Sequence, residues 1–196
     1  MKPFVFSKTY QRLIFSIIAS FAWFTLYAEP CFAQQQVINS STVKLKNEGA
    51  SRYLGISHRS ESSYYPLTRS QDSAELLSLK KPQDHNAVPL KYGDTIFLKA
   101  TEMRAWPDYW KQYNFLGVFG DGIYYWTEKD KHSHWVITSG ETPTTQSQQT
   151  GRPVLKGQTI RLKNVFNNQY LYAPNKDDWK LNTELESNNN TQWIIE

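Results

Sequence analysis

The sequence predicts an all-β protein, a single domain of twelve short strands built as three copies of a four-strand unit. Apolar residues alternate with polar ones over short segments, and no apolar stretch after residue 33 keeps a helical spacing. Polar and turn-forming residues separate these segments. The segments also recur in the same order three times, in repeats of about 37–80, 90–139 and 154–196.

The first strand of each copy has two apolar residues spaced two apart, in the segments 42–47, 93–100 and 157–164. The residues between them are predicted to face outward because strand side chains alternate; they are Lys44, Phe97 and Arg161. The second strands, 52–57, 114–119 and 169–174, each carry an aromatic residue followed by leucine: Tyr53-Leu54, Phe115-Leu116 and Tyr170-Leu171.

The third strands all end in threonine, in the segments 64–68, 123–127 and 179–183. In the middle copy Gly120–Gly122 supplies the turn before the third strand, and in the third copy Pro and Asx residues at 174–178 do so. The fourth strands are 73–79, 132–138 and 190–196. Each has one large apolar residue that we expect in the core: Leu76, Trp135 and Trp193.

A threefold repeat of a four-strand unit over about 160 residues resembles the β-trefoil. That resemblance implies a short barrel of six strands capped by three hairpins. The segments YGDTIFLKA, GQTIRLKNVFNNQYLY and NNTQWIIE are similar to MIR domains, the trefoils of protein mannosyltransferases. Fascin-like and ricin-type trefoils are less similar; the ricin-type mark is Gln, any residue, Trp, whereas Gln192 directly precedes Trp193. Trefoils serve as lectins, growth factors, inhibitors and actin bundlers, so the fold alone does not predict the function.

Residues 1–33 have the pattern of a secretory signal peptide. Basic residues precede a charge-free apolar run, Leu13–Ala28, and small residues stand at Cys31 and Ala33. The run is short for a membrane span, which needs about 20 residues. We expect cleavage after Ala33 and a secreted or periplasmic domain of residues 34–196 without a stable membrane span. An uncleaved membrane anchor is the alternative.

Cleavage would change the composition of the protein. It removes Lys2, Lys8, Arg12 and Glu29, so the formal net charge falls from +4 to +2. A mildly basic chain without a long charge run gives no support to nucleic-acid binding. The single cysteine also leaves, so the mature domain is predicted to lack disulfides and thiol chemistry.

No constellation of catalytic residues stands out. His132 and His134 lie two apart on an expected strand and are interpreted as a polar pair; a zinc site would need a third ligand. Asp177 and Asp178 fall in an expected turn, where aspartate bonds the local backbone. There is no glycine-rich phosphate loop and no nucleophile elbow. The chain is predicted to be no enzyme and to hold no cofactor or metal; Asn39 and Asn189 begin glycosylation sequons.

One segment breaks the threefold pattern. The first apolar residue of the first strand lies ten residues before the aromatic residue of the second strand in copies one and three, but nineteen before it in copy two. The nine extra residues fall within 101–113, between two strands, and loops on rigid scaffolds carry function. The candidate ligand-binding residues there are Arg104, Trp106, Asp108, Tyr109, Trp110 and Tyr113.

This loop has three interpretations. Its aromatic faces and hydrogen-bonding groups suit a glycan, its Trp, Tyr and Arg suit a protein partner, and its rings could pack as a small satellite core. Tyr124, Tyr125 and Trp126 of the next hairpin would extend the aromatic surface. The sequence therefore predicts an exported carbohydrate-binding, lectin-like protein, with a protein-interaction module (inhibitor, toxin accessory subunit or scaffold) as the alternative.

Overall fold

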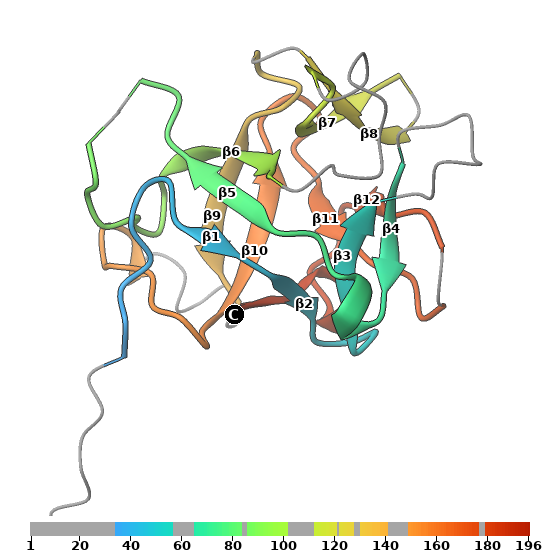
Figure 1. Ribbon diagram of the computed structural model, residues 1–196, viewed down its shortest axis with the longest axis horizontal. Coiled ribbons are helices and arrows are strands. Elements are labelled where there is room, and N and C mark those ends of the chain that lie inside the picture. Colours follow the sequence, from blue (N-terminus) through green and yellow to red (C-terminus); the bar gives the residue numbers. More distant parts are fainter. Residues whose placement is uncertain are drawn as a thin grey trace, which may run out of the picture. The chain divides into compact units, whose positions relative to one another are not determined.

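The computed structural model describes residues 34–56, 65–83, 86–101, 112–120, 122–127, 130–140, 149–176 and 179–196, which belong to one compact unit. Within them the backbone forms thirteen strands and two short 3-10 helices (Figure 1).

The first copy contains β1 (Thr42–Val43), β2 (Leu45–Asn47), β3 (Arg52–Ile56), β4 (Pro66–Arg69), η1 (Gln71–Ser73) and β5 (Leu77–Lys80). The second contains β6 (Thr95–Ala100), β7 (Phe115–Phe119), β8 (Gly122–Trp126) and β9 (Trp135–Ser139). The third contains β10 (Thr159–Asn164), β11 (Tyr170–Tyr172), β12 (Asn182–Glu184), η3 (Asn189–Thr191) and β13 (Trp193–Ile195).

The first and fourth strands of the three copies form a closed ring. The strands pair in the order β1-β5-β6-β9-β10-β13-β2, and β1 and β2 are two parts of the same expected strand. The ring closes where Leu45 of β2 lies opposite Ile195 of β13. All these pairs are antiparallel. Because the ring is closed, none of its strands is an unpaired edge strand.

The thirteenth strand arises because the first strand of the first copy is divided at Lys44. Each first strand pairs with the fourth strand of its own copy near its start and with that of the preceding copy near its end. In the first copy, β1 pairs with β5 and β2 pairs with β13. The backbone of Lys44 exchanges two hydrogen bonds of 3.0 Å with Glu196 at the crossover. The twelve expected strands are therefore present, one of them in two parts.

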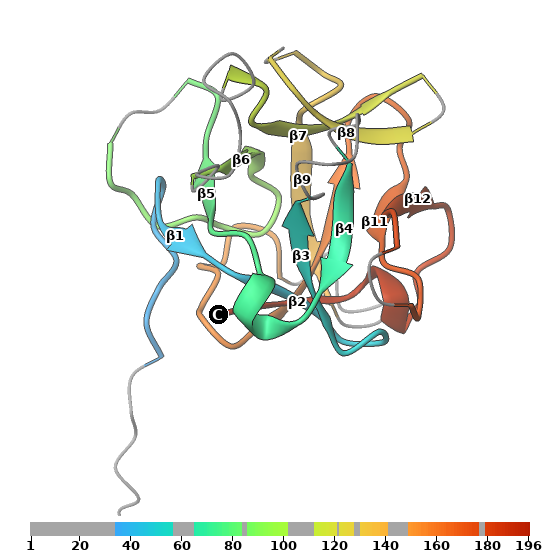
Figure 2. The same ribbon diagram turned by 45° about the vertical axis from the view of Figure 1, so that its right-hand side comes forward.

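The second and third strands of each copy form a hairpin. The pairs are β3 with β4, β7 with β8, and β11 with β12, and Figure 2 shows them together beside the barrel strands. The middle hairpin turns at Gly120, whose φ of +58° is the left-handed conformation that glycine adopts freely. Three hairpins on a six-strand barrel confirm the predicted arrangement.

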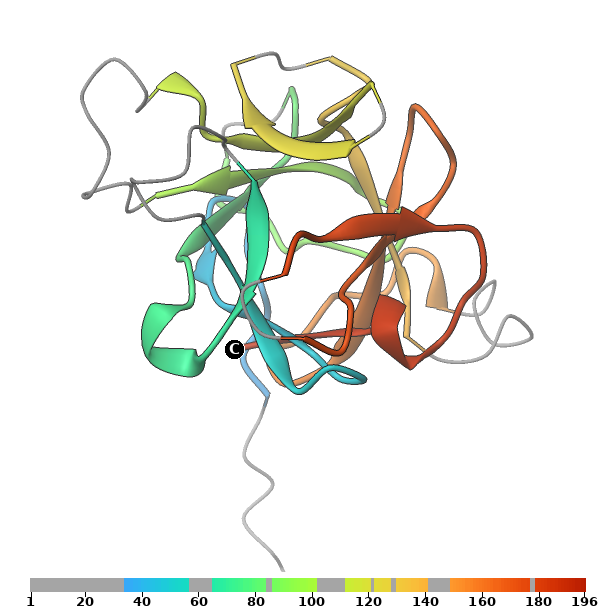
Figure 3. The same ribbon diagram turned by 90° about the vertical axis from the view of Figure 1, so that its right-hand side faces the viewer.

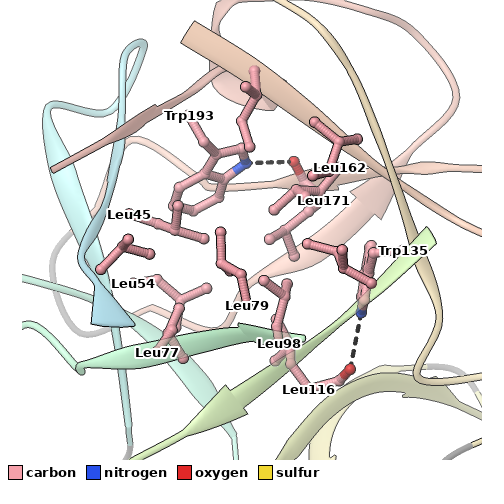
Figure 4. Close-up of a cluster of buried hydrophobic side chains, with 14 of the residues drawn as sticks. Leu45, Leu54, Leu77, Leu79, Leu98, Leu116, Trp135, Leu162, Leu171 and Trp193 are labelled. Atoms are coloured by element: carbon pink, nitrogen blue, oxygen red, sulfur yellow. Dashed lines mark hydrogen bonds between the residues drawn. The ribbon is translucent and has the colours of Figure 1, made fainter. Parts of the chain in front are cut away.

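The apolar side chains of the barrel and hairpins form one buried core (Figure 4). Trp135 and Trp193 are completely buried at equivalent positions, and each indole N–H donates to a backbone carbonyl. The acceptors are Leu116 O at 2.9 Å and Leu171 O at 3.0 Å. The prediction that these tryptophans belong to the core is confirmed.

In the first copy the equivalent residue is Leu77 rather than the expected Leu76. Leu77 lies opposite Val43 in the same way that Trp135 lies opposite Ile96. The alignment by sequence was one residue out because Leu76 and Leu77 are adjacent and equally apolar. A shift of one residue in a strand reverses the face that a side chain occupies, so Leu77 is buried and Leu76 only partly so.

Two residues expected on the outer face of the first strands are in fact buried. Phe97 is 6% exposed and Arg161 is 4% exposed. The Phe97 ring packs against Phe115 at 5.4 Å between centroids and against His134 at 4.8 Å. The Arg161 guanidinium donates to Ser139 O at 3.0 Å, and burial lowers its pKa. The outer surface of the barrel is thus partly covered by neighbouring side chains.

Candidate ligand-binding site

The third strands of the three copies converge around a pocket of about 330 Å³. Figure 3 shows the three hairpins arranged around a common centre. Residues from all three copies line this pocket, with tyrosine and tryptophan rings prominent among them: Tyr65, Gly122, Ile123, Tyr124, Tyr172, Pro174, Trp179, Lys180, Leu181 and Asn182. We call it the hairpin pocket.

The pocket exists because three equivalent positions carry different residues. The hairpin registers align Thr68, Tyr125 and Thr183 opposite the leucine of each second strand. Counting back three residues in each copy places Tyr65, Gly122 and Lys180 at equivalent positions. The Lys180 ammonium lies 3.4 Å from the centroid of the Tyr65 ring, a cation–π contact. Gly122 contributes no side chain, and a Cβ there would lie 3.0 Å from the Tyr124 ring. The missing side chain leaves the space open.

A second asymmetry supplies one of the rings. Tyr172 follows the aromatic-leucine pair of its copy at the position that Gly55 and Gly117 occupy in the other two. In the first copy the Arg69 side chain lies over Gly55, and in the second the Phe119 ring lies over Gly117. The third copy therefore places an aromatic ring in the pocket where the other copies have none.

Trp179 is the most exposed aromatic residue of the pocket, at 53%. Its backbone is fixed to the first copy, because its N–H donates to Thr68 Oγ1 at 3.2 Å and its carbonyl accepts from Thr68 N at 3.0 Å. The Thr68 hydroxyl, which is buried, also donates to Lys176 O. The Lys176 ammonium lies 4.5 Å from the Trp179 ring. A large apolar face is thus held open to solvent by contacts between repeats.

The pocket combines apolar faces with a few polar groups. Its rings are those of Tyr65, Tyr124, Tyr172 and Trp179, with Tyr65 and Tyr124 5.0 Å apart between centroids. Polar contacts can come from the tyrosine hydroxyls, the Lys180 ammonium and the Asn182 amide. Sites for small ligands combine apolar and aromatic surface with polar groups that fix the orientation of the ligand, and both kinds of group are present here. Within the described ranges, no group of three or more His, Cys, Asp or Glu side chains is placed to hold a metal ion.

Most of the loop predicted to bind a ligand lies outside the described residues. This applies to Arg104, Trp106, Asp108, Tyr109 and Trp110, which stay predictions. Tyr113, the last of the six, is half-buried against the core, and its ring lies 5.0 Å from that of Trp126.

The aromatic residues of the middle hairpin divide between two faces. Tyr124 lines the hairpin pocket and Trp126 is 36% exposed. Tyr125, expected to extend this surface, is instead completely buried in the core, because alternate residues of a strand face opposite sides. It occupies the position of Thr68 and Thr183 in the other copies, so Thr127 is not the equivalent threonine.

Tyr65, Tyr172, Trp179 and Lys180 were not predicted as site residues. The signal that could have found them is the difference between the copies at equivalent positions. One position is tyrosine, glycine or lysine in the three copies, and another is glycine in two copies and tyrosine in the third. Recognising that these positions meet requires the hairpin registers.

The two histidines of the 132–134 segment precede β9 and lie in different surroundings. The His132 ring stacks on Phe119, whereas His134 packs against Phe97. Neither histidine lies on a strand, and the two rings contact different aromatic residues. Asp177 and Asp178 lie outside the described residues.

The two sequon asparagines differ in accessibility. Asn39 is buried; its amide donates to Asn86 O at 2.9 Å and its Oδ1 accepts from Lys81 N at 2.8 Å. Asn189 is exposed at the start of η3. In the folded domain Asn39 is a structural residue rather than a surface acceptor.

In the part of the chain that the structure describes, there is no helix long and apolar enough to cross a bilayer.

No protein-family model matches the chain, and no curated protein matches it. Solved structures do resemble it. The SDF2-like protein from Arabidopsis thaliana aligns with a TM-score of 0.57 and 15% identity over 82% of this chain and 94% of that one. The lysenin pore aligns with a TM-score of 0.56 and 15% identity over 83% of this chain. SeviL bound to asialo-GM1 saccharide aligns with a TM-score of 0.50 and 13% identity over 80% of this chain and 97% of SeviL.

These similarities define the class of the protein. At such low identity they show the fold alone, and together with the threefold arrangement they make the domain a β-trefoil. The chain spans about half the length of lysenin, 47% of it in the pore structure.

Proposed function

We propose that this chain is an exported, non-enzymatic glycan-binding β-trefoil protein, similar to MIR domains, and that its ligand lies in the hairpin pocket. The observation that carries the proposal is the set of four aromatic rings around one pocket, with Trp179 more than half exposed. Contiguous exposed apolar surface often marks a binding site, and here four aromatic rings gather at one pocket. Sugars present C–H faces that stack on rings and hydroxyls that hydrogen-bond to amides, ammonium groups and phenols.

The comparisons give the proposal a general basis. SeviL is a protein of the same fold, and its structure holds a saccharide. Proteins that share a fold can bind different ligands, so the proposal depends on the pocket of this chain. The loop residues Arg104, Trp106, Asp108, Tyr109 and Trp110 are proposed as a further part of the glycan surface.

A glycan array followed by titration calorimetry tests the proposal. The full chain is expressed with its N-terminal segment and the purified product is tested for binding. Trp179→Ala is expected to lower the affinity for the selected glycan by at least about tenfold, because stacking on the most exposed ring is lost. Leu185→Ala, at a residue that is 67% exposed and outside the pocket, is the matched control and should bind normally.

Trp106→Ala and Trp110→Ala test the loop in the same assay. Weaker binding by either folded variant would support its part in the surface. The absence of glycan binding at millimolar ligand, or recovery of a stoichiometric protein partner without glycan binding, would overturn the proposed function in favour of the protein-interaction alternative.

A further inference from the structure

The outer face of the β7–β8 hairpin carries aromatic rings that continue beyond the pocket. Gly117 and Phe119 of β7 lie on this face, opposite Tyr124 and Gly122 of β8. The Phe119 ring leans over Gly117, where a Cβ would come within 2.8 Å of it, and the Tyr124 ring leans over Gly122. The two glycines thus make room for rings that lie along the hairpin rather than away from it.

These rings connect to others in an unbroken series. Trp126, two residues after Tyr124 on the same face of β8, has its ring centroid 5.0 Å from Tyr113 and 5.9 Å from Phe119. Phe119 stacks on His132 at 5.5 Å with an interplanar angle of 18°. His132 in turn contacts Phe166 of the third copy at 3.8 Å. We call this series, Tyr113, Trp126, Phe119, His132 and Phe166, the aromatic ridge.

The ridge is held in place before any ligand arrives. The His132 ring is fixed because Nδ1 donates to Val118 O at 2.9 Å and the backbone N–H donates to Asp130 Oδ1 at 2.9 Å. Phe166 follows Asn164, whose Oδ1 accepts from Phe166 N at 3.0 Å. Fixed rings lose little conformational entropy on binding, which favours affinity.

The ridge is also open to solvent and bears polar groups at its edge. Trp126 is 36% exposed and Phe166 is 44% exposed. The Lys131 ammonium lies 5.1 Å from the Phe166 ring centroid, and the ring of His132 lies between the two phenylalanines. Rings interleaved with cationic and imidazole groups match the chemistry that the pocket offers to a sugar.

We propose that the aromatic ridge is a second sugar subsite, continuous with the hairpin pocket, and that the ligand is an oligosaccharide rather than a single sugar. Tyr124 in the pocket and Trp126 on the ridge lie two positions apart on one face of β8, so their backbone positions are about 7 Å apart. A chain of two or more sugar units is long enough to extend from the pocket to the ridge, whereas a single sugar is not. The ridge also begins at Tyr113, the end of the loop predicted to bind the ligand.

This inference rests on the proposed function, and an affinity series separates the two. The glycan selected by the array is used as the monosaccharide, disaccharide, trisaccharide and tetrasaccharide in calorimetry. For the unchanged protein, affinity should rise by about tenfold or more from the shortest to the longest ligand. Trp126→Ala and Phe166→Ala should reduce this rise while leaving the affinity for the monosaccharide within about twofold. Thermal unfolding checks that both variants are folded. If Trp126→Ala does not fold, Phe166→Ala, at an exposed loop position, still tests the ridge.

The results distinguish a failure of the ridge proposal from a failure of the pocket proposal. If Trp179→Ala abolishes binding but affinity does not depend on ligand length, or Trp126→Ala and Phe166→Ala change nothing, the ridge is no subsite and the pocket proposal stands. If no glycan binds, both proposals fail. A protein partner that is captured by the unchanged protein and lost in both ridge variants, without length-dependent glycan binding, would make the ridge a protein interface and overturn the inference.

Discussion

The side-chain amide of Asn164 donates to the carbonyl of His132 at 2.8 Å, and so joins the end of β10 to the segment before β9. It also donates to His134 O at 3.2 Å, while its Oδ1 accepts from the loop backbone. Asn47 makes the same bonds in the first copy, to Asn190 O at 2.7 Å and Gln192 O at 3.1 Å. The second copy has Ala100 at this position, and there the chain continues into the nine-residue insertion.

Replacing Asn164 by alanine should destabilise the domain by about 2 kcal/mol. Loss of the buried amide removes one of the two hydrogen bonds at each of the His132 and His134 carbonyls. It also leaves two loop N–H groups without this acceptor, and a buried group that loses its partner costs about 1–3 kcal/mol. Urea unfolding followed by tryptophan fluorescence measures the change. Asn189→Ala, at an exposed asparagine, is the control, and equal stability of the two variants would contradict the capping role of Asn164.

Trp193→Phe should lower the free energy of unfolding by about 2 kcal/mol or more, and Trp135→Phe should have a similar effect. Each change removes an indole N–H from a buried carbonyl and leaves a void in the core. Thermal unfolding measures the effect, with Trp179→Phe on the surface expected to lie within about 0.5 kcal/mol of the unchanged protein. A core variant as stable as the surface variant would count against the indole bonds.

Gly122→Val should weaken glycan binding by about tenfold while keeping the fold. A side chain there meets the Tyr124 ring and occupies the space that the missing side chain leaves open. Stability should change little, because valine suits a strand. Calorimetry and thermal unfolding measure the two properties, and Thr127→Val, at an exposed residue just after β8, is the control. Unchanged affinity would show that the ligand does not enter the hairpin pocket.

Tyr125→Phe should leave stability at neutral pH unchanged or slightly higher and reduce its loss in alkali. The Tyr125 hydroxyl is buried and finds no hydrogen-bond partner among the described residues. Burial raises the pKa of Tyr125 well above its usual value, and the nearby Glu75 carboxylate raises it further. Because the pKa is higher in the folded state, the unfolded chain releases the proton first as pH rises past about 10, and stability falls from there.

Melting temperatures between pH 8 and about 11 measure this dependence. The phenylalanine variant should lose less stability over that window than the unchanged protein. Tyr53 also has a raised pKa, from burial and from its hydrogen bond of 2.9 Å to Glu196, so part of the alkaline loss should remain. Identical pH profiles would show that folding does not raise the pKa of Tyr125.

Much of the fold could be predicted from the sequence because it is repeated in the sequence. A residue pattern that recurs three times specifies three similar units, and the buried tryptophans and leucines follow from it. The repeat also contains a lysine near the end of each first strand. The ammonium groups of Lys46, Lys99 and Lys163 lie 5.9, 5.8 and 5.4 Å from the ring centroids of Tyr53, Phe115 and Tyr170. These pairs occupy adjacent strands in register, at Lys46 with Tyr53, Lys99 with Phe115 and Lys163 with Tyr170.

The candidate site could not be predicted in the same way. It depends on positions where the copies differ, and differences carry no periodic signal. Tyr65, Gly122 and Lys180 become neighbours because three hairpins meet. The pairing of the strands fixes, to within one residue, which positions of the three copies are equivalent. The slip between Leu76 and Leu77 shows how a short apolar segment leaves that alignment open.

The three repeats, their strands and the tryptophans of the core can be predicted from the amino-acid sequence alone, because side chains alternate along a strand and the pattern recurs three times. The tertiary structure decided which side chains meet between repeats. It placed Tyr125 in the core and Tyr124 in the pocket, left a cavity at Gly122, and joined Trp126 to Phe166 through a series of rings. Contacts of this kind lie between residues far apart in the chain, and the closure of the barrel brings them together.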